Sequence, residues 1–250
     1  MKGIFLGLAA LTLSLGAHAE GEALPLQFKL QPDNMAAAQR GARDFMAYCS
    51  GCHSMRNLRY SRLGRDLGIP DDKLKANLMF TSDKPGDQIK SAMPADDAKK
   101  WFGQTPPDLT VEARMRGPEW LYNYLMTFYV DPTRPTGMNN LVLPNASMPH
   151  VLWELQGLQA KKAEPRLGEG NAEAAAEHEG GTGLELVQPG SQTPEQYEKT
   201  VADIVTFMAY AAEPGRAQRI ATGAWVMAYL IFLLLPLTYF LKKEYWKDVH

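Results

Sequence analysis

Residues 49–53 read Cys-Ser-Gly-Cys-His, and this spacing is the attachment signature of a c-type haem. Two thiols three positions apart can each form a thioether bond to one vinyl group of a porphyrin, and the following His then lies over the iron. A structural zinc site usually takes four protein ligands, and the chain has no further Cys to supply them. A redox-active dithiol would accompany a βαβ pattern, which the sequence lacks. The motif therefore predicts one haem c, covalently held by Cys49 and Cys52, with His53 as an axial ligand.

The ligand on the opposite face of the iron decides the chemistry. A thioether ligand gives a higher potential suited to electron transfer, whereas an open face would allow peroxide or gas chemistry. Met148 lies in a proline-bounded loop, and the apolar residues 151–153 follow it and can cover the haem. His150 and Met93 are alternatives, and ligation by two His side chains would lower the potential. The residues favour Met148 and leave both alternatives open.

Composition and the N-terminus indicate an exported globular protein. The hydrophobic content of 45%, the charged content of 22% and the net charge of −2 are ordinary for a globular protein. The sequence has no basic stripe that would indicate nucleic-acid binding. Lys2, an apolar run over 4–15 and the small-residue site at 17–19 predict a signal peptide spanning 1–19. Its removal takes away Lys2, which leaves 25 basic against 28 acidic residues, net −3. Because the haem motif uses both Cys residues, we expect no disulfide.

The C-terminal part predicts a single membrane anchor over 216–241. Residues 220–241 carry no charge, and at ~1.5 Å per residue this stretch reaches about 33 Å, enough to span a bilayer core. Aromatic residues typical of membrane interfaces lie in and after it: Trp225, Tyr229, Tyr239, Tyr245 and Trp246. The signal peptide sets the orientation, with the domain exported and the tail 242–250 in the cytoplasm.

Between these ends, 20–215, the sequence predicts a mainly α domain with long loops. Apolar residues at helical spacing begin after Asn34 and lead to Cys49, and Gly117-Pro118 starts a helix that ends before Pro132. Thr193, Pro194 and Gln196 form a capping box that starts a further helix. The remaining expectations are a short helix near 72–80, loops over 81–100 and 131–149, and a surface insertion loop over 161–190.

Six segments occur in an order that resembles the cytochrome c1 family, the membrane-anchored haem subunits of the ubiquinol–cytochrome c reductase, or cytochrome bc1, complex. They are Cys49-Ser-Gly-Cys-His53 with Met55, Pro106-Pro107-Asp108-Leu109, Ala113-Arg114, Met148-Pro149, 203–214 and 243–248. The resemblance covers essentially the whole chain. It implies that His53 and Met148 are the axial ligands and that Cys49 and Cys52 form the thioether bonds. It also implies that Arg114 pairs with a haem propionate, and that Pro107, Leu109 and Trp120 pack near the haem.

The implied function is outer-sphere electron transfer from a Rieske iron–sulfur subunit to a soluble or membrane-bound cytochrome c. The chain would be an electron-transfer subunit of the reductase without substrate chemistry of its own, because the quinol sites belong to partner subunits such as cytochrome b. The resemblance implies a dimeric complex in the bacterial inner membrane, with the haem domain in the periplasm. Residues 161–200 carry eight acidic and four basic residues, an excess that fits docking of a basic cytochrome c.

Three alternatives remain from the sequence. The chain could be a membrane-anchored cytochrome c of another respiratory complex, which would share the haem and the anchor but not all six segments. It could be a haem enzyme or gas sensor with an open axial site, which Met148 disfavours. It could also be a structural membrane subunit whose haem only stabilises the fold, which would require a redox-silent haem.

Overall fold

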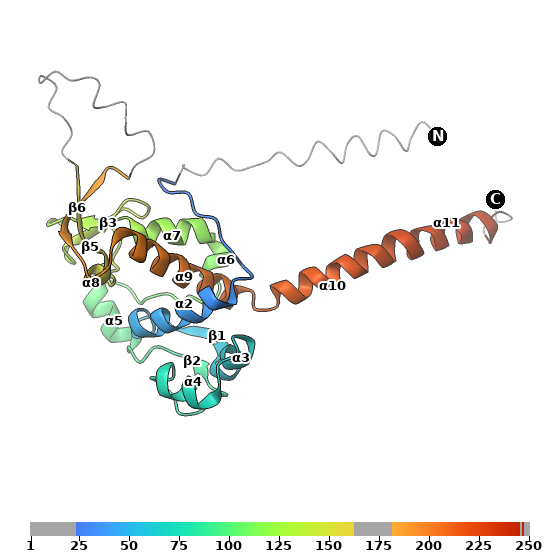
Figure 1. Cartoon of the computed structure of the whole chain (residues 1–250), viewed down its shortest axis with the longest axis horizontal. Helices are drawn as coiled ribbons and strands as arrows, with labels where there is room; N and C mark the ends of the chain where they lie inside the picture. The colour runs from blue at the N-terminus through green and yellow to red at the C-terminus, as the bar shows by residue number, and fades with distance from the viewer. Residues whose placement is uncertain (1–23, 163–181, 246, 248–250) are drawn as a thin grey trace, which may run out of the picture.

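The structure is a computed structural model that describes residues 24–162, 182–245 and 247 (Figure 1). The expected signal peptide, 1–19, lies outside the described residues, as does most of the expected insertion loop, 161–190. The described part is mainly helical and ends in a long apolar helix, so the predicted fold class is confirmed.

Two helices form the centre of the domain: α2 (Met35–Tyr48) and α9 (Pro194–Ala212) pack against each other along their buried faces. Both begin where the sequence predicts, and both are capped by a side chain. The Asn34 side chain accepts a hydrogen bond from the Ala37 backbone N–H at 3.0 Å, and the Thr193–Gln196 capping box is present at the start of α9. Each helix contributes a fully buried aromatic ring, Phe45 and Phe207, whose centroids lie 5.4 Å apart.

The crossing of α2 and α9 depends on Gly41. A Cβ atom at this position would overlap the Asp203 carbonyl group, so only glycine permits the two backbones to approach this closely. Beside the contact, the Arg40 guanidinium donates to both carboxylate oxygens of Asp203, at 2.6 and 2.8 Å. This bidentate pair fixes the register of the two helices at their point of closest approach.

Shorter helices surround this pair: α3 (Tyr60–Asp66), α4 (Asp71–Asn77), α5 (Ala95–Phe102), α6 (Glu112–Met115), α7 (Pro118–Met126) and α8 (Trp153–Gln156). The predicted start of α7 at Gly117-Pro118 is confirmed, and α4 corresponds to the helix expected near 72–80. The prediction of a loop over 81–100 is wrong for its last residues, which form the start of α5. Acidic residues in the first turn of α5 and basic residues in its last turn complement its dipole, and Gly103 ends it at φ +77°.

Within the described residues, six short strands that the sequence did not predict form three two-stranded antiparallel sheets. They are β1 (Met55–Arg59) with β2 (Gln88–Ile89), β3 (Phe128–Val130) with β4 (Met138–Asn140), and β5 (Gly157–Lys161) with β6 (Leu184–Pro189). Strands of two to six residues show too little alternation to be recognised from sequence. Strands β5 and β6 lie on either side of 163–181 and pair with each other. The described ends of the expected insertion loop, 161–190, therefore belong to a two-stranded sheet.

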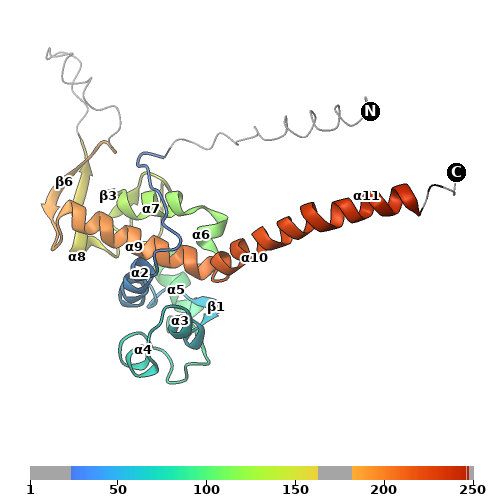
Figure 2. The same cartoon turned by 45° about the vertical axis from the view of Figure 1, so that its right-hand side comes forward.

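The chain leaves the domain as one continuous helix, formed by α10 (Arg216–Tyr229), the π-helical turn η2 (Leu230–Leu234) and α11 (Leu235–Glu244). This helix projects away from the domain (Figures 1 and 2). The helical stretch Gln218–Glu244 is long and apolar enough to cross a membrane. None of the residues in its most apolar part is buried against the domain. Pro236 lacks a backbone N–H, and the wider turn directly before it accommodates the missing hydrogen bond. The helix therefore fits a single-pass membrane anchor.

Candidate haem site

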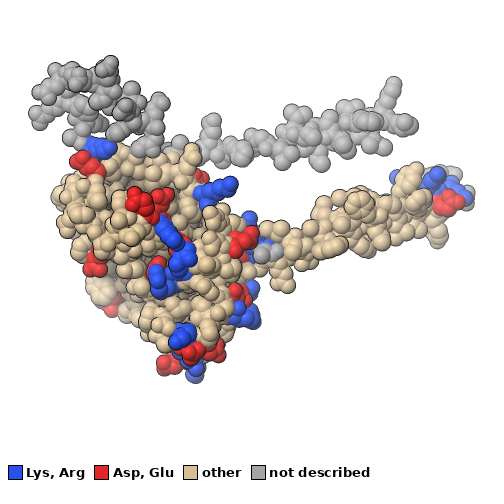
Figure 3. All heavy atoms as spheres, viewed as in Figure 1, with Lys and Arg blue, Asp and Glu red and all other residues tan. Residues whose placement is uncertain are grey.

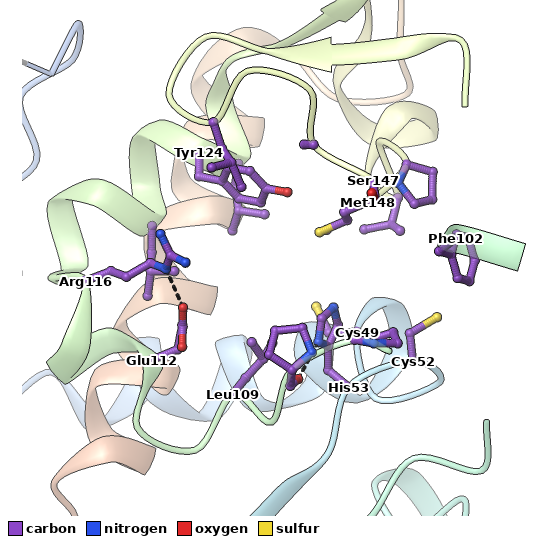
Figure 4. Close-up of a pocket in the computed structure, with 18 of the residues that line it drawn as sticks. Cys49, Cys52, His53, Phe102, Leu109, Glu112, Arg116, Tyr124, Ser147 and Met148 are labelled. Atoms are coloured by element: carbon purple, nitrogen blue, oxygen red, sulfur yellow. Dashed lines mark hydrogen bonds and ion pairs between the residues drawn. The ribbon is translucent and has the colours of Figure 1, made fainter. Parts of the chain in front are cut away.

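A cavity of 540 Å³ lies between the C-terminal end of α2, residues 104–109, helices α7 and α9, and the loop 143–151. Its size is within the range of cofactor sites, about 300–1,000 Å³, and its lining is largely apolar. Cys49, Cys52 and His53 lie at one side and Met148 at the other (Figure 4). The structure thus brings together the attachment motif and the favoured sixth ligand, which are far apart in sequence.

The motif is positioned by the end of α2. The Cys49 N–H donates to Phe45 O at 2.8 Å, and the Cys52 and His53 N–H groups then donate to Cys49 O at 3.1 and 2.9 Å. This tight turn directs the His53 side chain to the cavity. Burial raises the pKa of the Cys49 thiol to about 12, so in the folded domain without haem this thiol is protonated at neutral pH.

The His53 ring has a defined tautomer. Its Nδ1 lies 2.8 Å from the Pro107 carbonyl oxygen, and a carbonyl can only accept, so Nδ1 carries the proton. The lone pair is then on Nε2, the atom that remains free to coordinate a metal. Burial also lowers the pKa of His53, which favours the neutral, coordinating form.

Met148 lies opposite His53, with its thioether directed into the cavity (Figure 4). It is partly buried and packs against the hydrophobic core. Neither alternative ligand lines the cavity. His150 is buried instead, with its ring stacked on Phe128 at a centroid distance of 5.0 Å, and burial lowers its pKa to about 4.

Two buried asparagines shape the loop that carries Met148. The Asn140 side chain accepts from the N–H groups of Val142 and Leu143, at 2.9 and 3.1 Å, and donates to Tyr124 O at 2.7 Å. The Asn139 Oδ1 atom accepts from the N–H of Asn145 at 2.8 Å. The loop is therefore anchored to α7, and sequence reasoning did not identify either asparagine.

Of the remaining expected site residues, Pro107, Leu109 and Trp120 line the cavity. Arg114 does not. Its side chain is 67% exposed, lies outside the cavity and is 3.5 Å from the carboxylate of Glu213. Arg114 lines a different cavity, at the base of the C-terminal helix, so its predicted contact with a haem propionate stays a prediction.

Arg116, two residues after Arg114, does line the cavity. Its Nε lies 2.5 Å from Glu112 Oε1, and its guanidinium stands 4.4 Å over the Trp120 ring. Trp120 in turn stacks on Tyr124, with centroids 5.2 Å apart. The spacing of four residues between Glu112 and Arg116 is a helical signal that could have identified this pair, whereas Trp120 lies on the next helix, beyond Gly117 at φ +92°.

The model of the Cytochrome C1 family matches residues 29–249 of the chain. The chain belongs to the cytochrome c1 family. A protein of Allochromatium vinosum named cytochrome c1 is 46% identical over 235 residues, covering 94% of this chain and 91% of the relative. A Nitrosomonas europaea protein named ammonia monooxygenase gamma subunit is 41% identical, covering 98% of both chains. A cytochrome c1 of Rhodospirillum rubrum is 27% identical, covering 84% of this chain and 81% of the relative.

Family membership implies a haem c cofactor and the role of an electron carrier of the cytochrome c1 type. The residues of the cavity fit such a group. Two thiols lie next to an imidazole whose Nε2 is free, a thioether faces them, and the lining between them is apolar. The resemblance drawn from the six sequence segments is therefore confirmed at the level of the family.

Proposed function

We propose that this chain is the haem-bearing electron-transfer subunit of a quinol–cytochrome c reductase. When bound, haem c supplies a one-electron redox centre that receives electrons from a Rieske iron–sulfur subunit and passes them to a cytochrome c. The observation that carries this proposal is the placement of His53 and Met148 on opposite sides of an apolar cavity next to the attachment motif. Two protein ligands leave no open position for substrate, which favours a carrier over an enzyme or a sensor.

In this proposal each residue has a distinct task. Cys49 and Cys52 would hold the porphyrin through thioether bonds, and the Pro107 carbonyl holds the His53 ring in the orientation that would present Nε2 to the iron. Met148 supplies the thioether, which together with the apolar lining from Leu109 raises the reduction potential.

Arg116 provides the cation for the haem carboxylates. Its guanidinium is aligned by Glu112 and held against Trp120, so its orientation is set in advance. A planar guanidinium can donate two parallel hydrogen bonds to a carboxylate. We therefore assign to Arg116 the propionate contact that the sequence suggested for Arg114.

The proposed setting is a complex with cytochrome b and a Rieske subunit, dimeric, in a bacterial inner membrane. The haem domain would be periplasmic and the residues after α11 cytoplasmic, because the proposed signal peptide exports the N-terminus. The acidic excess of 161–200 would guide a basic cytochrome c to the domain, an interaction that salt weakens.

The test uses the purified full-length holoprotein. We expect a sharp reduced c-type spectrum that carbon monoxide does not change, and co-purification with a cytochrome b and a Rieske protein from native membranes. Oxidation by a basic cytochrome c should slow as ionic strength rises. Carbon monoxide binding by the unaltered protein would instead favour a haem enzyme or sensor. Isolation with different partners would assign the chain to another respiratory complex.

A further inference from the structure

A second cavity, of 680 Å³, lies where the haem domain meets the membrane anchor. It is lined by the segment before α2, by α3 and α6, and by the chain between α9 and α10. In Figure 3 charged side chains gather where α10 leaves the domain, and the helix beyond is free of charge until its far end. The cavity therefore opens beside the point at which the anchor becomes apolar.

Five arginines from three segments surround this place. On one side, Arg62 and Arg65 lie 3.0 and 3.3 Å from the Asp66 carboxylate, which also accepts from the Tyr210 hydroxyl at 3.1 Å. These two guanidinium groups share a single carboxylate, so cationic charge exceeds anionic charge on this side of the cavity.

On the other side, three arginines surround Glu213. The distances from its carboxylate to Arg114, Arg216 and Arg219 are 3.5, 3.9 and 2.6 Å. Asp33 is the third carboxylate at the cavity, so four lining arginines face three carboxylates, and Arg219 adds a fifth cation beside Glu213. A guanidinium has five N–H donors, and each of these ion pairs engages only part of them. Donors therefore remain for another anion.

Most of the remaining lining residues are apolar, among them Leu30, Pro32, Met35 and Pro214. A site that combines arginine forks with apolar walls, next to a membrane helix, matches an amphiphile with an anionic head group. The N-terminal end of α10, a helix of 14 residues, adds a partial positive charge at the same place.

The arginines at the start of the anchor lie where membrane proteins usually have few positive charges, if the haem domain is exported as proposed. Arginines near the exported end of a membrane helix oppose the usual bias, which places Lys and Arg on the cytoplasmic side. A function that requires cations at this interface would account for them.

We propose that this arginine cavity binds the phosphate head group of an anionic phospholipid from the leaflet on the side of the haem domain. The lipid phosphate would lie between Arg62 and Arg216, with its glycerol and first acyl carbons against the apolar wall. The inference rests on the proposed membrane anchor but not on the haem chemistry.

The experiment uses the full-length holoprotein in nanodiscs of equal parts phosphatidylcholine and phosphatidylglycerol, with retained lipid measured by native mass spectrometry. The test variant is R62Q/R216Q, because Asp66 then keeps Arg65 and Glu213 keeps Arg219. The matched control is K75Q/K90Q, which removes the same charge at exposed positions outside the cavity.

We expect the unaltered protein and the control to retain phosphatidylglycerol over phosphatidylcholine. The test variant should lose about 25-fold in phosphatidylglycerol retention, since each of the two basic residues near a membrane surface contributes about fivefold. The single variants R62Q and R216Q, each expected to lose about fivefold, keep the test decisive where the double variant fails to yield holoprotein.

Equal retention in the test variant and the control would overturn the proposal, as would retention of both lipids alike. Displacement of the lipid by millimolar inorganic phosphate would show a site for soluble anions and would also overturn it. The readout does not involve haem redox chemistry. A negative result would therefore leave the proposed electron-transfer function intact, and loss of that function would leave this test valid.

Discussion

The two sides of the haem cavity are built in different ways. The His53 side is local: five consecutive residues at the end of α2 carry both thiols and the imidazole, and one backbone carbonyl, Pro107 O, sets the ring. The Met148 side depends on a loop shaped by two buried asparagines and anchored to α7. The first side should therefore survive small disturbances of the fold, whereas the second requires the complete tertiary structure.

The largest expected effect follows from His53→Ala. The thioether bonds would still hold the porphyrin through Cys49 and Cys52, but the iron would lose the ligand on its local side. We expect complete loss of the sharp reduced c-type spectrum and of electron transfer to cytochrome c, measured by difference spectroscopy and stopped flow. A variant with normal spectrum and rate would show that His53 is not a ligand.

Met148→Leu tests the opposite side with a substitution of similar volume. The haem should stay attached, carbon monoxide should now bind, and the potential should fall by roughly 100–300 mV, within the ~0.8 V that axial ligands span. Redox titration with carbon monoxide difference spectra measures both changes. If the variant behaves like the unaltered protein, the ligand must be sought at His150 or Met93.

Asn140→Ala should weaken the Met148 side without touching either ligand. Two backbone N–H groups and the Tyr124 carbonyl would lose their partner inside the fold, and each unsatisfied buried group costs about 1–3 kcal/mol. We expect a lower unfolding temperature together with partial carbon monoxide binding.

Asn77→Ala is the control for Asn140→Ala, since the exposed Asn77 side chain makes one hydrogen bond, to Lys73 O. It should change neither the unfolding temperature nor carbon monoxide binding. A destabilised Asn140→Ala protein that still excludes carbon monoxide would mean that the asparagine supports the fold but not the ligand.

The smallest effect is expected at the edge of the cavity, where Arg116 and Arg114 form a matched pair. Removing a cation near the haem favours the oxidised form, so Arg116→Gln should lower the potential. A loss of about 1 kcal/mol corresponds to ~40 mV for one electron. Arg114→Gln, which removes an exposed cation outside the cavity, should change the potential by less. The reverse order in redox titrations would return the propionate contact to Arg114.

The same contrast explains what could be predicted from the sequence. Local signals specified the haem motif, the helix start after Asn34, the cap at Thr193 and the anchor, because neighbouring residues carry all of their information. Met148 could be favoured because prolines bound its loop. The roles of Asn139 and Asn140 could not be foreseen, since their partners lie in α7 and along the loop. Arg114 and Arg116 differ by two positions, which on a helix changes the face completely.

The packing of α2 on α9 has a consequence for the order of biogenesis. The helix that presents the thiols finds its main packing partner at residues 194–212, directly before the anchor. If the chain is exported N-terminus first, α2 crosses long before α9, and its apolar face has no cover in the interval. The thiols therefore remain accessible while most of the chain is synthesised, and the domain closes only as the anchor enters the bilayer. We therefore expect haem attachment to occur before the domain closes. A chain shortened before 194 should still acquire haem but should fail to form a protease-resistant domain.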